Sequence, residues 1–100
     1  MKPLSLEDIV KLLQENKSSL HSSFGVTRIG IFGSFAQGRE TISSDIDMVV
    51  EFEKDKKNIH NFLQLKRFME KELSRKIDLG FEHSLKPLIR DKVKGSIIYV

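Results

Sequence analysis

The fold prediction starts from two short motifs, Gly33-Ser34-Phe35-Ala36-Gln37-Gly38 and Ser44-Asp45-Ile46-Asp47. The β-branched and aromatic run from Val26 to Phe32 predicts a strand that ends at Gly33. Glycine permits a close backbone approach there, and a helix beginning at Ser34 would direct free N–H groups and a hydroxyl outward. Such a turn suits phosphate oxygens. A Gly-Ser pair on its own is nevertheless a weak signal.

A second strand is predicted from Asp45 onward, where apolar and polar side chains alternate. Asp45 and Asp47 are two residues apart, so both side chains leave the same face, which they share with Val49 and Glu51. The opposite face carries Ile46, Met48, Val50 and Phe52. An isolated Asp-x-Asp pair is more often two surface acids than a metal site, so this pair also needs support from elsewhere in the chain.

Asp78 repeats the arrangement in a third predicted strand, residues 76–81, where its two neighbours Ile77 and Leu79 face the other way. If the second and third strands pair, three carboxylates converge. At about 4 Å, two like charges repel by roughly 4 kcal/mol at an effective dielectric of 20. A divalent cation would relieve this repulsion, and an all-oxygen ligand set suits Mg²⁺ and disfavours zinc.

The combination of motifs is more specific than its parts. With each residue type at about 5 to 7% of an average chain, Gly-Ser and Asp-x-Asp at one fixed gap occur together by chance in roughly one chain of this length per thousand. Nucleotidyl transfer requires a place for a triphosphate and a place for its metal ions. A phosphate site followed by acids on the next two strands supplies both.

Periodicity around the motifs alternates between helix and strand. Ser5 and Asp8 form a predicted capping box for a first helix that ends near Lys17, and Asn58 is the predicted cap of a helix that runs to about Ser74. The other predicted segments are a serine-rich loop over 18–25, a solvated turn over 54–57, a last helix from 86 or 87 to 95 and an edge strand over 97–100. We therefore predict an α/β (α+β) fold, a small mixed sheet of three to four strands with helices packed on it.

Length and composition narrow the possible functions. One hundred residues form a single domain, residues 1–100, which excludes a two-domain polymerase. The absence of cysteine excludes disulfides, thiolate zinc sites and cysteine nucleophiles, and it favours a cytoplasmic location. No long apolar run predicts a membrane span, and a net charge of +3 with scattered basic residues is a weak signal for nucleic acid. His21, His60 and His83 follow no metal-ligand spacing.

The two motifs resemble the signature of the minimal nucleotidyltransferases of the DNA polymerase β-like superfamily, Gly-Ser-x-x-x-Gly followed by Asp-x-Asp. This resemblance implies the superfamily fold, with Gly33 and Ser34 holding the triphosphate of ATP. It implies that Asp45 and Asp47 hold two Mg²⁺ ions and that Asp78 is a third ligand near the attacking hydroxyl. Residues 86–100 also look like the closing segment of the family.

Family members of this size are similar to the antitoxin half of toxin–antitoxin pairs. The resemblance implies a protein adenylyltransferase that transfers AMP from ATP to a tyrosine of a HEPN-domain RNase toxin, with which it could form a hetero-oligomer. Two alternatives stay open: an antitoxin that neutralises its partner by binding alone, and transfer to RNA, for which the chain has no appended basic domain. The sequence does not reveal the acceptor residue, the nucleotide base or the oligomeric state.

One position departs from the family pattern. Members often carry Arg where this chain has Gln37, and Arg39 two residues later is a candidate substitute. If the missing arginine normally neutralises phosphate charge, nucleotide affinity is reduced, but the predicted metal ligands are all present.

Overall fold

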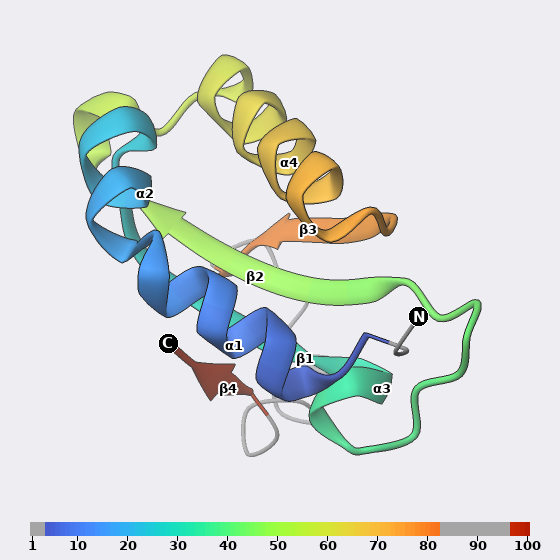
Figure 1. The fold of residues 1–100 in the computed structure, drawn as a ribbon. Coiled ribbons are helices and arrows are strands. Elements are labelled where there is room, and N and C mark those ends of the chain that lie inside the picture. Colours follow the sequence, from blue (N-terminus) through green and yellow to red (C-terminus); the bar gives the residue numbers. More distant parts are fainter. Residues whose placement is uncertain (1–3, 83–96) are drawn as a thin grey trace.

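The computed structural model describes residues 4–82 and 97–100 and combines four helices and a four-stranded sheet with a short 3₁₀ turn (Figure 1). The helices are α1 (Leu6–Glu15), α2 (Lys17–Phe24), α3 (Gly33–Ala36) and α4 (Ile59–Leu73), and the 3₁₀ turn is η1 (Lys54–Lys56). The strands are β1 (Val26–Phe32), β2 (Ile46–Phe52), β3 (Ile77–Phe81) and β4 (Ile98–Tyr99). The predicted mixed sheet with packed helices is confirmed.

The sheet has the strand order β3-β2-β1-β4. β1 is antiparallel to both of its neighbours, β2 and β4, whereas β2 and β3 run parallel. Parallel neighbours need a long crossover connection, which α4 supplies between β2 and β3. The predicted edge strand at the C-terminal end is confirmed as β4, and the predicted helix over 86–95 lies outside the described residues.

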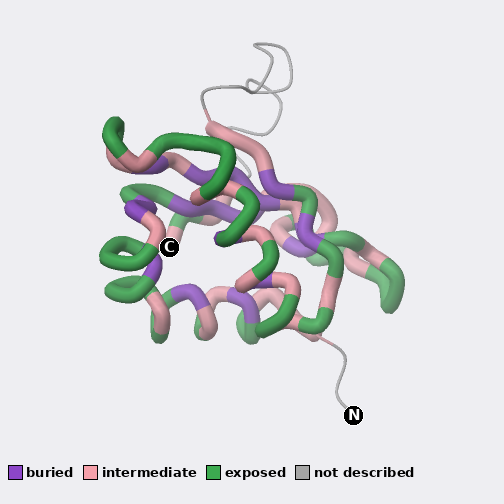
Figure 2. Tube along the Cα trace, turned by 90° about the horizontal axis from the view of Figure 1, so that it is seen from above, coloured by how far each residue is buried: buried purple, intermediate pink, exposed green. Residues whose placement is uncertain are grey.

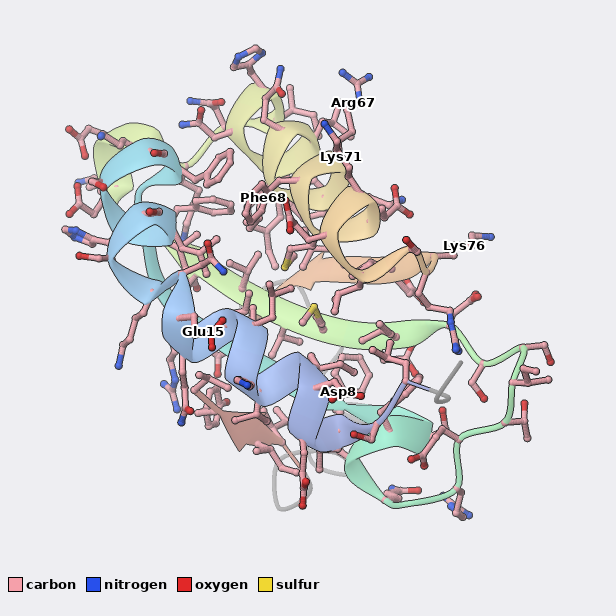
Figure 3. The ribbon with its side chains drawn as sticks, in the orientation of Figure 1. Asp8, Glu15, Arg67, Phe68, Lys71 and Lys76 are labelled. Atoms are coloured by element: carbon pink, nitrogen blue, oxygen red, sulfur yellow. The ribbon has the colours of Figure 1, made fainter. Side chains whose placement is uncertain are left out.

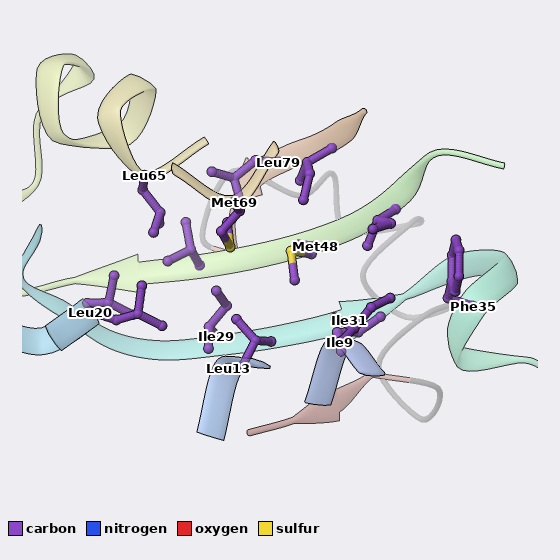
Figure 4. Close-up of a cluster of buried hydrophobic side chains, with 14 of the residues drawn as sticks. Ile9, Leu13, Leu20, Ile29, Ile31, Phe35, Met48, Leu65, Met69 and Leu79 are labelled. Atoms are coloured by element: carbon purple, nitrogen blue, oxygen red, sulfur yellow. The ribbon is translucent and has the colours of Figure 1, made fainter. Parts of the chain in front are cut away.

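The hydrophobic core lies between one face of the sheet and the helices (Figure 4). Ile9 and Leu13 of α1 are buried in the same cluster as Leu65 and Met69 of α4. The strands contain most of the buried residues, whereas much of the helix surface is exposed (Figure 2). Asp47 and Asp78 are less buried than the isoleucines that precede them. The sheet therefore has an apolar, helix-covered face and a second face that carries the acidic residues.

Local sequence signals account for both long helices. Ser5 and Asp8 form the predicted capping box at the start of α1, each side chain accepting a hydrogen bond from the other residue's backbone N–H. The Asn58 side chain caps α4 by accepting from the N–H of Asn61 at 2.8 Å. Ser74, with φ of 51°, ends α4 where the sequence predicted it.

The loop predicted over residues 18–25 is wrong, because this segment forms helix α2. Serine has only moderate helix propensity, but tertiary packing outweighs it here. Leu20 is buried, and the ring centroids of Phe24 and Phe68 are 5.7 Å apart. Phe68 lies on the side of α4 that faces α2 (Figure 3). Gly25, with φ of 78°, forms the left-handed C-cap, which explains the glycine that the sequence placed in a loop.

Two smaller features complete the fold. Val49 lies on the face of the acids as predicted, but it is only 1% exposed, so that face is not uniformly open to solvent. The predicted turn over 54–57 is largely η1, and Lys57 next to it pairs with Glu51 at 2.8 Å. Within the described ranges, no helix is long and apolar enough to cross a membrane.

Candidate active site

The sheet register brings two of the three predicted carboxylates together. Asp47 of β2 and Asp78 of β3 are direct partners in the parallel pair, so their side chains leave the same face of strands about 4.8 Å apart. Asp45 lies one residue before β2 begins. Burial raises the pKa of Asp47, and the negative charges of Asp78 and then Asp45 raise it further. Asp78 and Asp45 are therefore both close enough to Asp47 to disfavour its charged form.

Gly33 brings the turn after β1 against this acidic cluster. Phe32, the last residue of β1, pairs with Asp47 across the antiparallel register. The chain turns at Gly33 with φ of 74°, and a Cβ atom at this position would lie 2.1 Å from Oδ2 of Asp47. Two separate constraints therefore require glycine at position 33: the left-handed backbone conformation and the close approach to the Asp47 carboxylate.

The helix predicted to begin at Ser34 is present as α3, a single turn. Phe35 in this turn is 1% exposed, so its ring fixes α3 to the hydrophobic core. Ser34 is half-buried, and its carbonyl accepts a hydrogen bond from the N–H of Arg39 at 2.8 Å. Gln37 and Arg39 are both exposed, so either side chain has room to move toward a ligand.

Arg75 is a residue at this site that the sequence patterns did not identify. It follows the C-cap of α4, and its Nη1 atom donates a hydrogen bond to the carbonyl oxygen of Ser44 at 2.8 Å. Its guanidinium carbon lies 5.6 Å from the centroid of the Phe35 ring. A single arginine between a helix and a strand has no distinctive spacing, so only the fold connects it with the residue before Asp45.

The residues of the acidic cluster are chemically suited to magnesium. Among residues 4–82 and 97–100, no three Asp, Glu or His side chains already form a metal-binding group. Mg²⁺ is usually bound by only one or two carboxylates, together with waters and substrate phosphates. The carboxylate oxygens of Asp45, Asp47 and Asp78 are the kind of donor that such an ion prefers, and the charges of Asp45 and Asp78 both act on Asp47.

The histidines of the described residues lie apart from this arrangement. His21 on α2 pairs with Glu53, with 2.7 Å between Nε2 and Oε1, and His60 is exposed on the first turn of α4. His83 lies outside the described residues. The acidic cluster of Asp45, Asp47 and Asp78 is thus the candidate site for a metal-bound phosphate among the described residues.

Comparisons with known proteins agree with this architecture. A family model described as "Nucleotidyltransferase domain" matches residues 9–100. The chain is 36% identical over 100 residues to the protein adenylyltransferase MntA of Thermococcus cleftensis, covering 100% of both proteins. A solved chain named a "putative minimal nucleotidyltransferase" superposes with a TM-score of 0.78 at 30% identity, covering 95% of each chain. A chain from a toxin-antitoxin structure with AMP-PNP gives a TM-score of 0.67 at 25% identity, covering 96% of this chain and 72% of that one. This protein therefore belongs to the nucleotidyltransferase domain family.

Proposed function

We propose that this protein is a Mg²⁺-dependent adenylyltransferase that acts as an antitoxin, moving AMP from ATP to a tyrosine of a HEPN-type toxin. The observation that carries the proposal is the register of Asp47 with Asp78 beside the turn at Gly33. Support for the nucleotide and the partner comes from the relatives, which include a protein adenylyltransferase and a toxin-antitoxin structure with AMP-PNP.

In this proposal, each group of residues has a separate task. The triphosphate binds at the turn that begins with Gly33. The backbone N–H groups of α3 have no acceptors within the helix, so they can donate to phosphate oxygens together with the Ser34 hydroxyl. Asp45, Asp47 and Asp78 would hold two Mg²⁺ ions, which when bound neutralise phosphate charge and favour the deprotonated acceptor. The exposed Asp78 lies on an edge strand, so it is the carboxylate best placed to meet an acceptor hydroxyl from a partner protein.

The reaction itself is an in-line displacement at the α-phosphorus. The acceptor tyrosine oxygen forms a bond to this phosphorus as the bond to the β-phosphate oxygen breaks, and the phenol proton leaves to solvent. The products are an adenylylated tyrosine and pyrophosphate. The protein itself contributes by aligning the acceptor with the triphosphate and by placing charged groups around the reacting phosphate.

The test is incubation of the protein with ATP labelled at the α-phosphate and with its co-expressed toxin partner. We expect label on the partner, located on a tyrosine by mass spectrometry, and no label when Mg²⁺ is chelated. Asp47→Asn should abolish the labelling, whereas Asp55→Asn, which removes an exposed acid of η1, should retain it.

Other results of the labelling experiment would favour one of the two alternative functions. Neutralisation of the toxin without any label on it would show that the protein acts by binding alone. A labelled RNA in place of a labelled protein would show that the acceptor is a nucleic acid. Retention of full labelling by Asp47→Asn would contradict the assignment of the site.

A further inference from the structure

The loop between α3 and β2, residues 37–45, has little packing of its own. Most of its side chains are exposed, including Ile42, which is 87% exposed, and Asp45 itself. Its internal hydrogen bonds centre on Thr41. The Thr41 N–H donates to Ser44 Oγ at 2.8 Å, the Thr41 carbonyl accepts from the Ser44 N–H at 3.1 Å, and the Thr41 hydroxyl hydrogen-bonds with those of Ser43 and Ser44. These bonds fix the shape of the turn but leave its position relative to the sheet undetermined.

Two consecutive residues before β3 fix that position. The Arg75 side chain donates to the carbonyl of Ser44, and the carbonyl of Lys76 accepts from the N–H of Ile46 at 3.0 Å. Asp45 is the residue between these two bonds. Its backbone is therefore held on both sides by the segment that leads into Asp78.

The same arginine also contacts the phosphate-side element. Its guanidinium carbon lies 5.6 Å from the centroid of Phe35, the buried residue of α3. A guanidinium can donate in its plane to a carbonyl while its face rests against an aromatic ring, which an ammonium group cannot do. Arg75 thus touches α3, contacts the residue before Asp45, and belongs to the chain segment that enters β3.

We propose that Arg75 is a positioning residue that sets Asp45 relative to the turn at Gly33 and to Asp78. The proposal rests on the proposed function, because it gives Asp45 the role of a magnesium ligand. Partners that orient a metal ligand without touching the metal commonly change metal affinity by about 10- to 100-fold when they are removed. Arg75 acts on Asp45 through the Ser44 carbonyl in this way.

The first measurement is amide hydrogen exchange on the metal-free, nucleotide-free protein. Arg75→Met keeps an unbranched apolar stem but cannot donate to Ser44. We expect the amides of Ser44 and Ile46 to exchange about tenfold faster, with the β1 amides unchanged. Arg67→Met is the matched control, since Arg67 is exposed on α4 and points away from the sheet (Figure 3), and it should leave these rates unchanged.

The second measurement is the Mg²⁺ dependence of AMP transfer. Arg75→Met should raise the Mg²⁺ concentration for half-maximal rate by about 10- to 100-fold and recover activity at high Mg²⁺. Arg75→Lys, which keeps a charged donor group but not the planar contact with Phe35, should fall between Arg75→Met and the wild type. A residue with a merely structural role would lower the rate by the same factor at every Mg²⁺ concentration.

Several results would overturn the proposal. They are unchanged exchange at Ser44 and Ile46, exchange that accelerates equally in β1, or a rate loss that Mg²⁺ does not restore. If the wild-type protein transfers no AMP, the proposed function fails, and the exchange measurement alone then decides whether Arg75 fixes the Asp45 segment.

Discussion

Replacement of Gly33 by alanine tests whether the turn after β1 and the carboxylate of Asp47 form one site. The new Cβ atom would lie 2.1 Å from Oδ2 of Asp47 and 3.0 Å from its Cγ, so the carboxylate would have to move. The backbone φ of 74° adds strain of its own. Gly38 provides the matched control, because it has a φ of 70° and nothing lies within 4 Å of a Cβ built on it.

The two variants share one energetic cost and differ in another. A positive φ costs a non-glycine residue roughly 1–2 kcal/mol, partly offset by about 0.4–1 kcal/mol from the stiffer unfolded chain. Gly38→Ala should therefore lower the free energy of unfolding by about 0.5–1 kcal/mol. Gly33→Ala adds an overpacking cost of about 1–3 kcal/mol, for a total of about 1.5–4 kcal/mol.

The assay is urea unfolding of both variants, followed by AMP transfer under conditions where each is folded. We expect Gly33→Ala to lose about 100-fold in transfer rate, because a displacement of about 1 Å near reacting groups has an effect of that size. Equal losses of stability and of rate in the two variants would refute the reasoning, since the φ strain would then explain everything and the contact with Asp47 nothing.

Three further predictions concern stability. Asp47→Asn should raise the free energy of unfolding without metal by about 1 kcal/mol, because it removes a partly buried charge and its repulsion from Asp78 and Asp45. A clear loss in urea unfolding would instead indicate a structural role. Leu20→Ala should cost about 2–5 kcal/mol by opening a cavity under α2, and a loss below 1 kcal/mol in the same assay would contradict the packing of that helix. Arg28→Gln should cost about 0.5–1 kcal/mol, because it removes the guanidinium that lies 3.9 Å above the Tyr99 ring and pairs with Glu82 at 3.8 Å. Thermal unfolding with no shift would show that these contacts contribute nothing.

Patterns of short range predicted most of the fold. The strand alternation around Asp47, the capping box at Ser5 and the cap at Asn58 each depend on residues within a few positions of one another. Helix α2 was missed because its evidence is of long range, namely the burial of Leu20 and the contact between Phe24 and a ring on α4. The serines of that helix lie on its exposed surface, so the serine-rich composition gives no information about the side that packs against the core.

The same distinction between short-range and long-range evidence applies to the candidate site. Gly33 and the aspartates could be identified from spacing, because glycine at a turn and acids two residues apart on a strand have a local signature. Arg75 could not, because its partners Ser44 and Phe35 are 31 and 40 positions away in the sequence and the hydrogen bond depends on the β2–β3 pairing. A side chain that orients another residue produces no regular spacing in the sequence by which it could be recognised.

The register of the acids follows from strand direction more than from the acids themselves. β2 and β3 both begin with Ile-Asp, so Ile46 pairs with Ile77, and this parallel alignment places Asp47 opposite Asp78. An antiparallel pair starting from the same residues would put the two acids at opposite ends of the strands. The 15-residue helix α4 between the strands permits the parallel arrangement, because a tight turn cannot connect parallel neighbours. Asp47 and Asp78 thus meet because the same dipeptide, Ile-Asp, begins a strand on either side of α4. The two isoleucines are buried on the opposite face, so they resist the one-residue slip that would separate the carboxylates.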